Sequence, residues 1–213
     1  SPALFDAVAK AAQGRLHEFK SQDLASTAWA YATADVSSAA LFGDRRFTES
    51  CATADLTGDQ LCQLHQWQLW LEEHGHSWPP LPTPLAQRCR VAFCAGDGSP
   101  SRLQRSVAKV LAELKLSPRE EVRTAQGYSL DAVVGIDGCD VAVEVDGPSH
   151  FVGRSRTPTG ATALKRRQLR AAGWRLLPIP YWEWDALSRD PAGQREYLTS
   201  GLKAAAEEAT ASG

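Results

Sequence analysis

The sequence of 213 residues contains no methionine, few cysteines and no long hydrophobic run. Its five cysteines are scattered without a Cys-x-x-Cys pair, and no Cys/His cluster has zinc-finger spacing, so reduced thiols are expected rather than a zinc site. No apolar run reaches about 18 residues, so we expect no membrane-spanning segment, while peripheral membrane binding stays open. The formal net charge of -2 excludes a globally basic chain. Any contact with nucleic acid must therefore come from a local group of Lys and Arg.

The composition and the proline pattern predict two folded parts and a connector. Because the chain begins with Ser-Pro and lacks Met, we expect a fragment whose natural start, including any targeting peptide, has been removed. The string Trp-Pro-Pro-Leu-Pro-Thr-Pro at residues 78–84 stops helices and favours extended backbone. We therefore expect an α-helical segment over residues 1–77, a Pro/Gly-rich linker over 78–100 and an α/β domain over 101–213.

The first part carries helical periodicity. Leu4, Val8, Ala11 and Ala12 predict one buried face, and a second helix is expected from about Gln22, giving a helical hairpin over residues 3–33. A further helix is expected over 58–74. The string at residues 15–33 (Arg-Leu-His-Glu-Phe-Lys-Ser-Gln-Asp-Leu-Ala-Ser-Thr-Ala-Trp-Ala-Tyr-Ala-Thr) resembles the octotricopeptide repeats of algal organellar RNA-binding proteins. One repeat cannot bury both of its flanks, so the segment is expected to be the end of a longer solenoid.

The second part alternates helices with short strands. Asp137 and Gly138 predict a hairpin turn between the second and third strands. The expected helices cover residues 101–115, 161–172 and 192–209, and the expected strands cover 120–124, 129–136, 139–145 and 174–179. The order before the closing helix is α-β-β-β-α-β, which is the core topology of the PD-(D/E)XK restriction-endonuclease-like superfamily.

This resemblance in fold points to a set of acidic residues. Asp131 takes the place of the superfamily's Asp and Glu144 that of its Glu, but Asp146 stands where the Lys is expected. Side chains alternate along a strand, so Glu144 and Asp146 share a face that Asp131 can join through the hairpin. Three carboxylates suit Mg²⁺ or Mn²⁺, with His150 or Lys165 assisting proton transfer.

Simpler structural roles remain open for the same residues. A carboxylate inside the apolar string Val-Ala-Val-Glu-Val must be paired or bound to a cation, so Glu144 marks either a site or a salt bridge to Lys165 or Arg166. His150 follows an ordinary Asp-Gly-Pro turn and is as well explained by a hydrogen bond within its loop.

Several strings in this part resemble the RAP domain, an RNA-associated domain abundant in apicomplexans and also found in organellar proteins. They are Tyr-Ser-Leu-Asp (128–131), Val-Ala-Val-Glu-Val-Asp-Gly-Pro-Ser-His-Phe (141–151), Gly-Ala-Thr-Ala-Leu-Lys-Arg-Arg-Gln-Leu (160–169), Gly-Trp (173–174) and Ile-Pro-Tyr-Trp-Glu-Trp (179–184). The resemblance covers residues 129–187. It implies a module of chloroplast or mitochondrial proteins that act in RNA processing, stability, translation or ribosomal-RNA maturation.

A local basic segment accompanies these strings. Residues 151–175 contain seven cations and no Asp or Glu: Arg154, Arg156, Lys165, Arg166, Arg167, Arg170 and Arg175. Such a group can contact several phosphates of RNA, expected to be single-stranded, and Tyr181 can stack an unpaired base. At least one of Trp182 and Trp184 is expected in the core. Alternatively, Lys165 and Arg166 neutralise the carboxylates while Arg167 and Arg170 merely face solvent.

Three functions follow from these features. The first is an RNA-binding module that grips phosphates without cutting. The second is a Mg-dependent endoribonuclease using Asp131, Glu144, Asp146 and Lys165. The third is a catalytically inactive scaffold that docks a protein within an RNA-processing or ribosomal assembly.

Overall fold

The computed structural model describes residues 2–96, 99–153 and 155–208. The chain forms two compact units, Ser1–Asp97 (unit 1) and Gly98–Gly213 (unit 2). Each unit has its own buried residues. None of the helices in the described residues is both long and apolar enough to cross a membrane.

Unit 1 is helical. Its elements are α1 (Pro2–Gln13), η1 (Leu16–Glu18), α2 (Ser21–Ala34), α3 (Ala39–Phe42), α4 (Arg45–Thr53), α5 (Gly58–Glu73) and α6 (Thr83–Cys94). Helix α2 packs mainly against α5, and α5 packs against α6. The core is aromatic: Phe42 contacts Phe47 with ring centroids 4.9 Å apart and Trp67 with centroids 5.3 Å apart. Large apolar rings therefore supply much of the burial that stabilises this unit.

The buried face of α1 differs from the predicted one. Leu4 and Val8 are exposed, at 62% and 42%, whereas Ala9 and Ala12 are buried. Phe5 explains the shift, because its backbone carbonyl accepts a hydrogen bond of 2.6 Å from the Tyr31 hydroxyl and its ring meets the Tyr31 ring edge-on. Ala11 is exposed as well, so the prediction was wrong for Leu4, Val8 and Ala11 and is confirmed for Ala12.

The expected linker contains a helix. Helix α6 occupies Thr83–Cys94, within the segment 78–100 that was predicted to be a connector, and it buries Leu85 and Cys89. Pro84 does not prevent this helix, because a proline in the first turn lacks only an N–H that has no partner within the helix. The proline signal therefore marks the start of a helix here.

Unit 2 is a mixed α/β structure. Its elements are α7 (Arg102–Glu113), β1 (Arg119–Arg123), β2 (Ser129–Ile136), β3 (Cys139–Asp146), η2 (Pro148–His150), α8 (Gly160–Ala171), β4 (Arg175–Pro180), α9 (Tyr181–Ala186) and α10 (Pro191–Glu208). The four strands lie in the order β1-β2-β3-β4, antiparallel from β1 to β3 and with β4 parallel to β3. The turn between β2 and β3 falls at Asp137 and Gly138, which both have positive φ, as an Asp-Gly hairpin turn requires.

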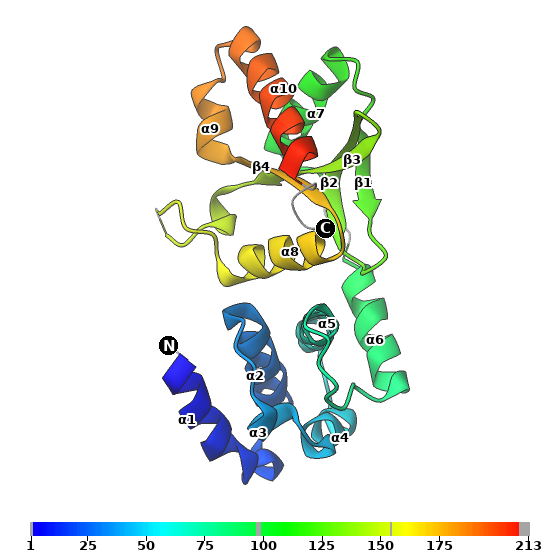
Figure 1. Ribbon diagram of the computed structural model, residues 1–213, viewed down its shortest axis with the longest axis vertical. Coiled ribbons are helices and arrows are strands. Elements are labelled where there is room, and N and C mark those ends of the chain that lie inside the picture. The colour runs from blue at the N-terminus through cyan, green and yellow to red at the C-terminus, as the bar shows by residue number, and fades with distance from the viewer. Residues whose placement is uncertain (1, 97–98, 154, 209–213) are drawn as a thin grey trace. The chain divides into compact units, whose positions relative to one another are not determined.

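Helices cover both faces of the sheet (Figure 1). On one face, Val141, Val143 and Val145 of β3 pack against residues of α7 and α10, including Leu111 and Leu198. On the other face, α8 lies against β3 and β4. Val141, Val143 and Val145 alternate with Ala142, Glu144 and Asp146 along β3, so the strand faces an apolar layer on one side and α8 on the other.

The aromatic run after β4 forms the short helix α9, which the sequence did not predict. Its Trp184 is buried at 2% exposure, as expected for one of Trp182 and Trp184.

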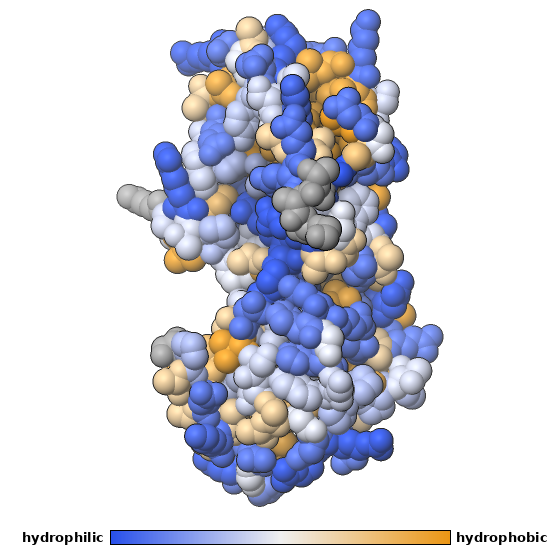
Figure 2. Space-filling model, viewed as in Figure 1, coloured by the Kyte–Doolittle hydropathy of each residue, from blue (hydrophilic) through white to orange (hydrophobic). Residues whose placement is uncertain are grey.

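On the face shown in Figure 2, hydrophilic residues predominate and hydrophobic ones are confined to separate areas.

A buried charge cluster and a candidate RNA-binding surface

The carboxylates of Glu144 and Asp146 lie on the α8 face of β3, as the alternation predicts. Glu144 is 5% exposed and Asp146 is 2% exposed. Ions so deeply buried are costly unless each has a partner of opposite charge and hydrogen bonds. Two consecutive residues of α8, Lys165 and Arg166, supply those partners.

Lys165 pairs with Glu144. Its Nζ lies 2.5 Å from Glu144 Oε2 and also donates a hydrogen bond of 2.9 Å to the backbone carbonyl of Ser129. The other carboxylate oxygen, Glu144 Oε1, is buried and has no hydrogen-bond partner among the described residues. Burial raises the pKa of Glu144 to about 7; the charge of Lys165 opposes the rise, and the negative charges of Asp131 and Asp146 add to it.

Arg166 and His150 hold Asp146 between them. Arg166 donates to Asp146 Oδ2, and His150 Nδ1 lies 3.1 Å from Asp146 Oδ1. Burial alone would raise the pKa of Asp146, but the hydrogen bonds and charges of His150 and Arg166 bring it below its ordinary value. The hydrogen bond to Asp146 in turn raises the pKa of His150. His150 and Arg166 therefore engage both oxygens of a buried acid at the end of β3.

Asp131 joins the cluster from β2. Ala132 pairs with Val143 across the hairpin, so Asp131 comes beside Glu144. Its Oδ1 accepts a hydrogen bond of 2.6 Å from Gln104 Nε2 of α7, and its Oδ2 accepts one of 2.7 Å from the backbone N–H of Val145. Asp131 thus ties α7 to the sheet, and both of its oxygens are engaged.

The three carboxylates do not fit a metal ion as they stand. Among residues 2–96, 99–153 and 155–208, no group of three or more His, Cys, Asp or Glu side chains could hold one. Of the six oxygens of Asp131, Glu144 and Asp146, only Glu144 Oε1 is without a hydrogen-bond partner. Protein cations, His150 and N–H groups engage the other five oxygens. Mg²⁺ or Mn²⁺ at these acids would have to displace those donors.

The predicted RNA-contacting residues separate into two groups. Lys165 and Arg166 point inward to the carboxylates and keep only 24% and 17% of their side chains exposed. Arg156 and Arg170 are exposed, Arg167 is half-buried, and Arg154 lies outside the described residues. Arg156 sits over the Trp182 ring, 5.6 Å from its centroid. Tyr181 is half-buried, with its ring edge-on to Trp182 at a centroid distance of 5.2 Å.

Comparison with known proteins concerns this same part of the chain. Residues 143–200 match the family model named "RAP domain". They form a RAP domain. A curated relative, "RAP domain-containing protein, chloroplastic" from Oryza sativa subsp. japonica, is 41% identical over 98 residues. The matched segment covers 46% of this chain but only 15% of the rice protein.

The RAP domain contains most of the charge cluster. It runs from β3 into α10 and so includes Glu144, Asp146 and all of α8, whereas Asp131 lies before it. Its limits differ from the 129–187 suggested by the sequence strings, because the family match starts later and continues into the closing helix. Trp174, at the end of α8, was not among the candidate site residues. The signal that could have found it is Gly followed by Trp at a helix end.

Proposed function

We propose that the chain is an organellar RNA-binding protein and that its RAP domain binds RNA through exposed arginines at the two ends of α8. This proposal rests on one observation about residues 151–175, which contain no Asp or Glu. Arg156 and Arg170 are exposed there, whereas Lys165 and Arg166 form ion pairs with buried acids. Arg156 precedes α8 and Arg170 lies in its last turn. A helix of 12 residues is about 18 Å long, so the two cations suit separate phosphates of one strand.

The proposed cellular role rests on the match of residues 143–200 to the RAP domain. The rice relative is named chloroplastic. That name supports an organelle, and a chloroplast in particular, as the place of action. Processing, stability, translation and ribosomal-RNA maturation are the roles that we propose for an RNA-binding module of this kind. Protein partners in such an assembly belong to the same proposal.

Finer assignments of the two units belong here as well. We propose that unit 2 is a PD-(D/E)XK nuclease-like core, supported by the order α7-β1-β2-β3-α8-β4 and by the parallel pairing of β4 with β3. We propose that unit 1 is an octotricopeptide-like helical segment, supported by the packing of α2 on α5 and of α5 on α6. Unit 2 would then have kept a nuclease fold for holding RNA.

The geometry supports binding more than cleavage. Asp146 stands where a nuclease of this fold has a lysine, and Arg166 and His150 take up both of its oxygens. We therefore expect labelled RNA to be cut no faster by the native chain than by Glu144→Gln in millimolar Mg²⁺ or Mn²⁺. Metal-dependent cleavage that the substitution abolishes would instead establish the endoribonuclease function.

Charge reversal tests the binding surface. The double variant Arg156→Glu/Arg170→Glu is expected to weaken binding of single-stranded RNA at low salt and to reduce the slope of log affinity against log salt by roughly 1.4, because each phosphate contact on a single strand contributes roughly 0.7. Fluorescence anisotropy at several salt concentrations measures both quantities.

The matched control is Lys109→Glu, which changes a charge on α7, on the other face of the sheet. Lys109 keeps 76% of its side chain exposed, so its replacement should leave the slope unchanged. Equal slopes for all three proteins would refute the assignment of these arginines. Absence of RNA binding even at low salt, with stable capture of a protein partner, would favour the docking scaffold.

A further inference from the structure

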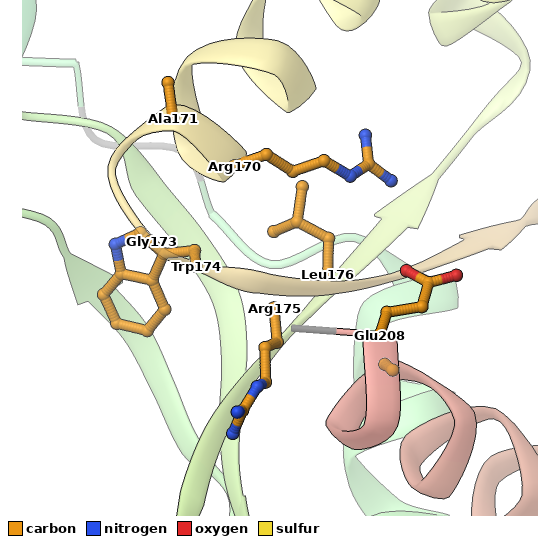
Figure 3. Close-up of a pocket in the computed structure, with 8 residues that line it drawn as sticks. Arg170, Ala171, Gly173, Trp174, Arg175, Leu176 and Glu208 are labelled. Carbon is orange, nitrogen blue, oxygen red and sulfur yellow. The ribbon is translucent and has the colours of Figure 1, made fainter. Parts of the chain in front are cut away.

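An open pocket lies at the end of α8, away from the buried charge cluster. It has a volume of about 420 Å³ and is walled by Arg170, Trp174, Arg175 and Glu208, among others (Figure 3). A second hollow of about 450 Å³ shares Trp174 and Arg175. Both volumes lie in the range of roughly 300–1,000 Å³ that is usual for small-ligand sites.

The turn after α8 fixes the position of Trp174. Gly173 has a φ of +86° and its N–H donates to the carbonyl of Arg170, while the N–H of Trp174 donates to the carbonyl of Leu169. This pair of hydrogen bonds is a Schellman motif, which ends a helix with a left-handed residue, usually glycine. The tryptophan is thus held by its backbone at a defined place beside the pocket.

The side chain of Trp174 is only half-buried. In the Schellman motif, a hydrophobic residue at this position ordinarily packs against the last turn of the helix. The other two tryptophans of unit 2 do make ring or cation contacts: Trp182 with Phe151 and Arg156, and Trp184 with Tyr197. Within the described part of the chain, Trp174 has no such contact. Its indole therefore offers surface to a ligand.

Arg170 and Arg175 are the two cations that line this pocket. Neither makes an ion pair or a side-chain hydrogen bond with any residue that the structure describes, in contrast to Lys165 and Arg166 on the same helix. Asp140, which lines the second hollow, is paired with Arg119 at 2.6 Å. The carboxylate of Glu208 also borders the pocket. It can accept a hydrogen bond from the amino group of a base.

We infer that Trp174, Arg170 and Arg175 form a subsite for one unpaired nucleotide of single-stranded RNA. The base stacks on the indole, and the two guanidinium groups hold the adjacent phosphates. An indole without an aromatic partner and two arginines that line the same pocket suit a flexible strand, whereas a duplex keeps its base faces covered. This inference rests on the proposed RNA binding and names the form of RNA that is bound.

Binding by Trp174→Ala and Trp174→Phe tests the subsite in the full chain. The probes are a labelled 12-nucleotide single strand and a blunt RNA duplex of the same length. For Trp174→Ala we expect affinity for the single strand to fall roughly 10-fold, the usual effect of losing one stacked base, with the salt slope unchanged. Duplex affinity should change less than twofold, and Trp174→Phe should restore most of the single-strand affinity.

The outcomes separate the subsite from the proposed function. If the native chain binds the single strand and Trp174→Ala binds it equally well, the subsite is wrong and RNA binding stands. Absence of binding by the native chain at low salt overturns both. An equal loss for single strand and duplex, or a loss that Trp174→Phe does not repair, identifies a structural role for Trp174 and also overturns the subsite.

Discussion

Replacing Arg166 with methionine is expected to lower the free energy of unfolding of unit 2 by about 3–5 kcal/mol at neutral pH, the usual cost of breaking a buried ion pair from one side. The substitution keeps an unbranched apolar chain of similar length but removes the cation that faces Asp146. Asp146 is 2% exposed and cannot recover its hydration, so its charge is left with His150 alone. Hydrogen exchange of the β3 amides at increasing urea concentrations measures the stability of this unit by itself.

Arg170→Met is the matched control, because Arg170 lies on the same helix and is exposed. It should change stability by no more than about 0.5 kcal/mol. A loss below about 1 kcal/mol for Arg166→Met would mean that the ion pair with Asp146 is not maintained in solution.

The stability of unit 2 is expected to fall as pH rises from about 5 to 7.5, and Glu144→Gln should remove much of this fall. Glu144 has an ordinary pKa of 4.5 that burial raises to about 7 in the folded chain. Between these values the folded state binds more protons than the unfolded state, so each step up in pH favours unfolding. A difference of this size corresponds to roughly 3 kcal/mol. Urea denaturation of both proteins across this pH range measures the effect.

His150 contributes in the same direction at higher pH. Its pKa is raised above the ordinary value of 6.5, so its stabilisation is present below 6.5 and is lost as pH rises through the raised value. His150→Gln should therefore flatten the upper part of the profile, and Glu144→Gln the lower part. Asp146 acts oppositely, since its lowered pKa gives stability that is lost only in acid. A profile of Glu144→Gln that parallels the native one would show that Glu144 is ionised throughout.

Strand alternation was enough to predict that Glu144 and Asp146 lie on the same face of β3. That inference needed only the period of two along β3 and the Asp-Gly turn, both of which are local. The partners were harder to assign, because Lys165 and Arg166 were alternative partners for one acid. The structure uses one for each acid, since consecutive helical residues diverge by about 100° and so reach two strand positions. Which cation pairs with which acid depends on how α8 lies on the sheet. No local sequence pattern predicts that orientation.

The errors in the helical unit have different origins. The apolar spacing of Leu4 and Val8 was correct for a helix, but which face is buried depends on the neighbour, here Tyr31. The helix α6 was missed because prolines at residues 79–84 were taken to exclude helix beyond them, although Pro84 sits in its first turn. The first error therefore concerns packing, and the second concerns the position of a proline within its helix.

The two ion pairs of Lys165 and Arg166 affect the entropy that unit 2 would lose on binding a ligand. They clamp the middle of α8 to β3 at adjacent positions, so the helix can neither roll nor slide without breaking a buried pair. Arg170, in the last turn of α8, is therefore carried on a preorganised helix, and less backbone entropy would be lost on binding RNA there. A strand of RNA would have to adapt its own path to fixed points on the protein, which places the conformational adjustment on the nucleic acid.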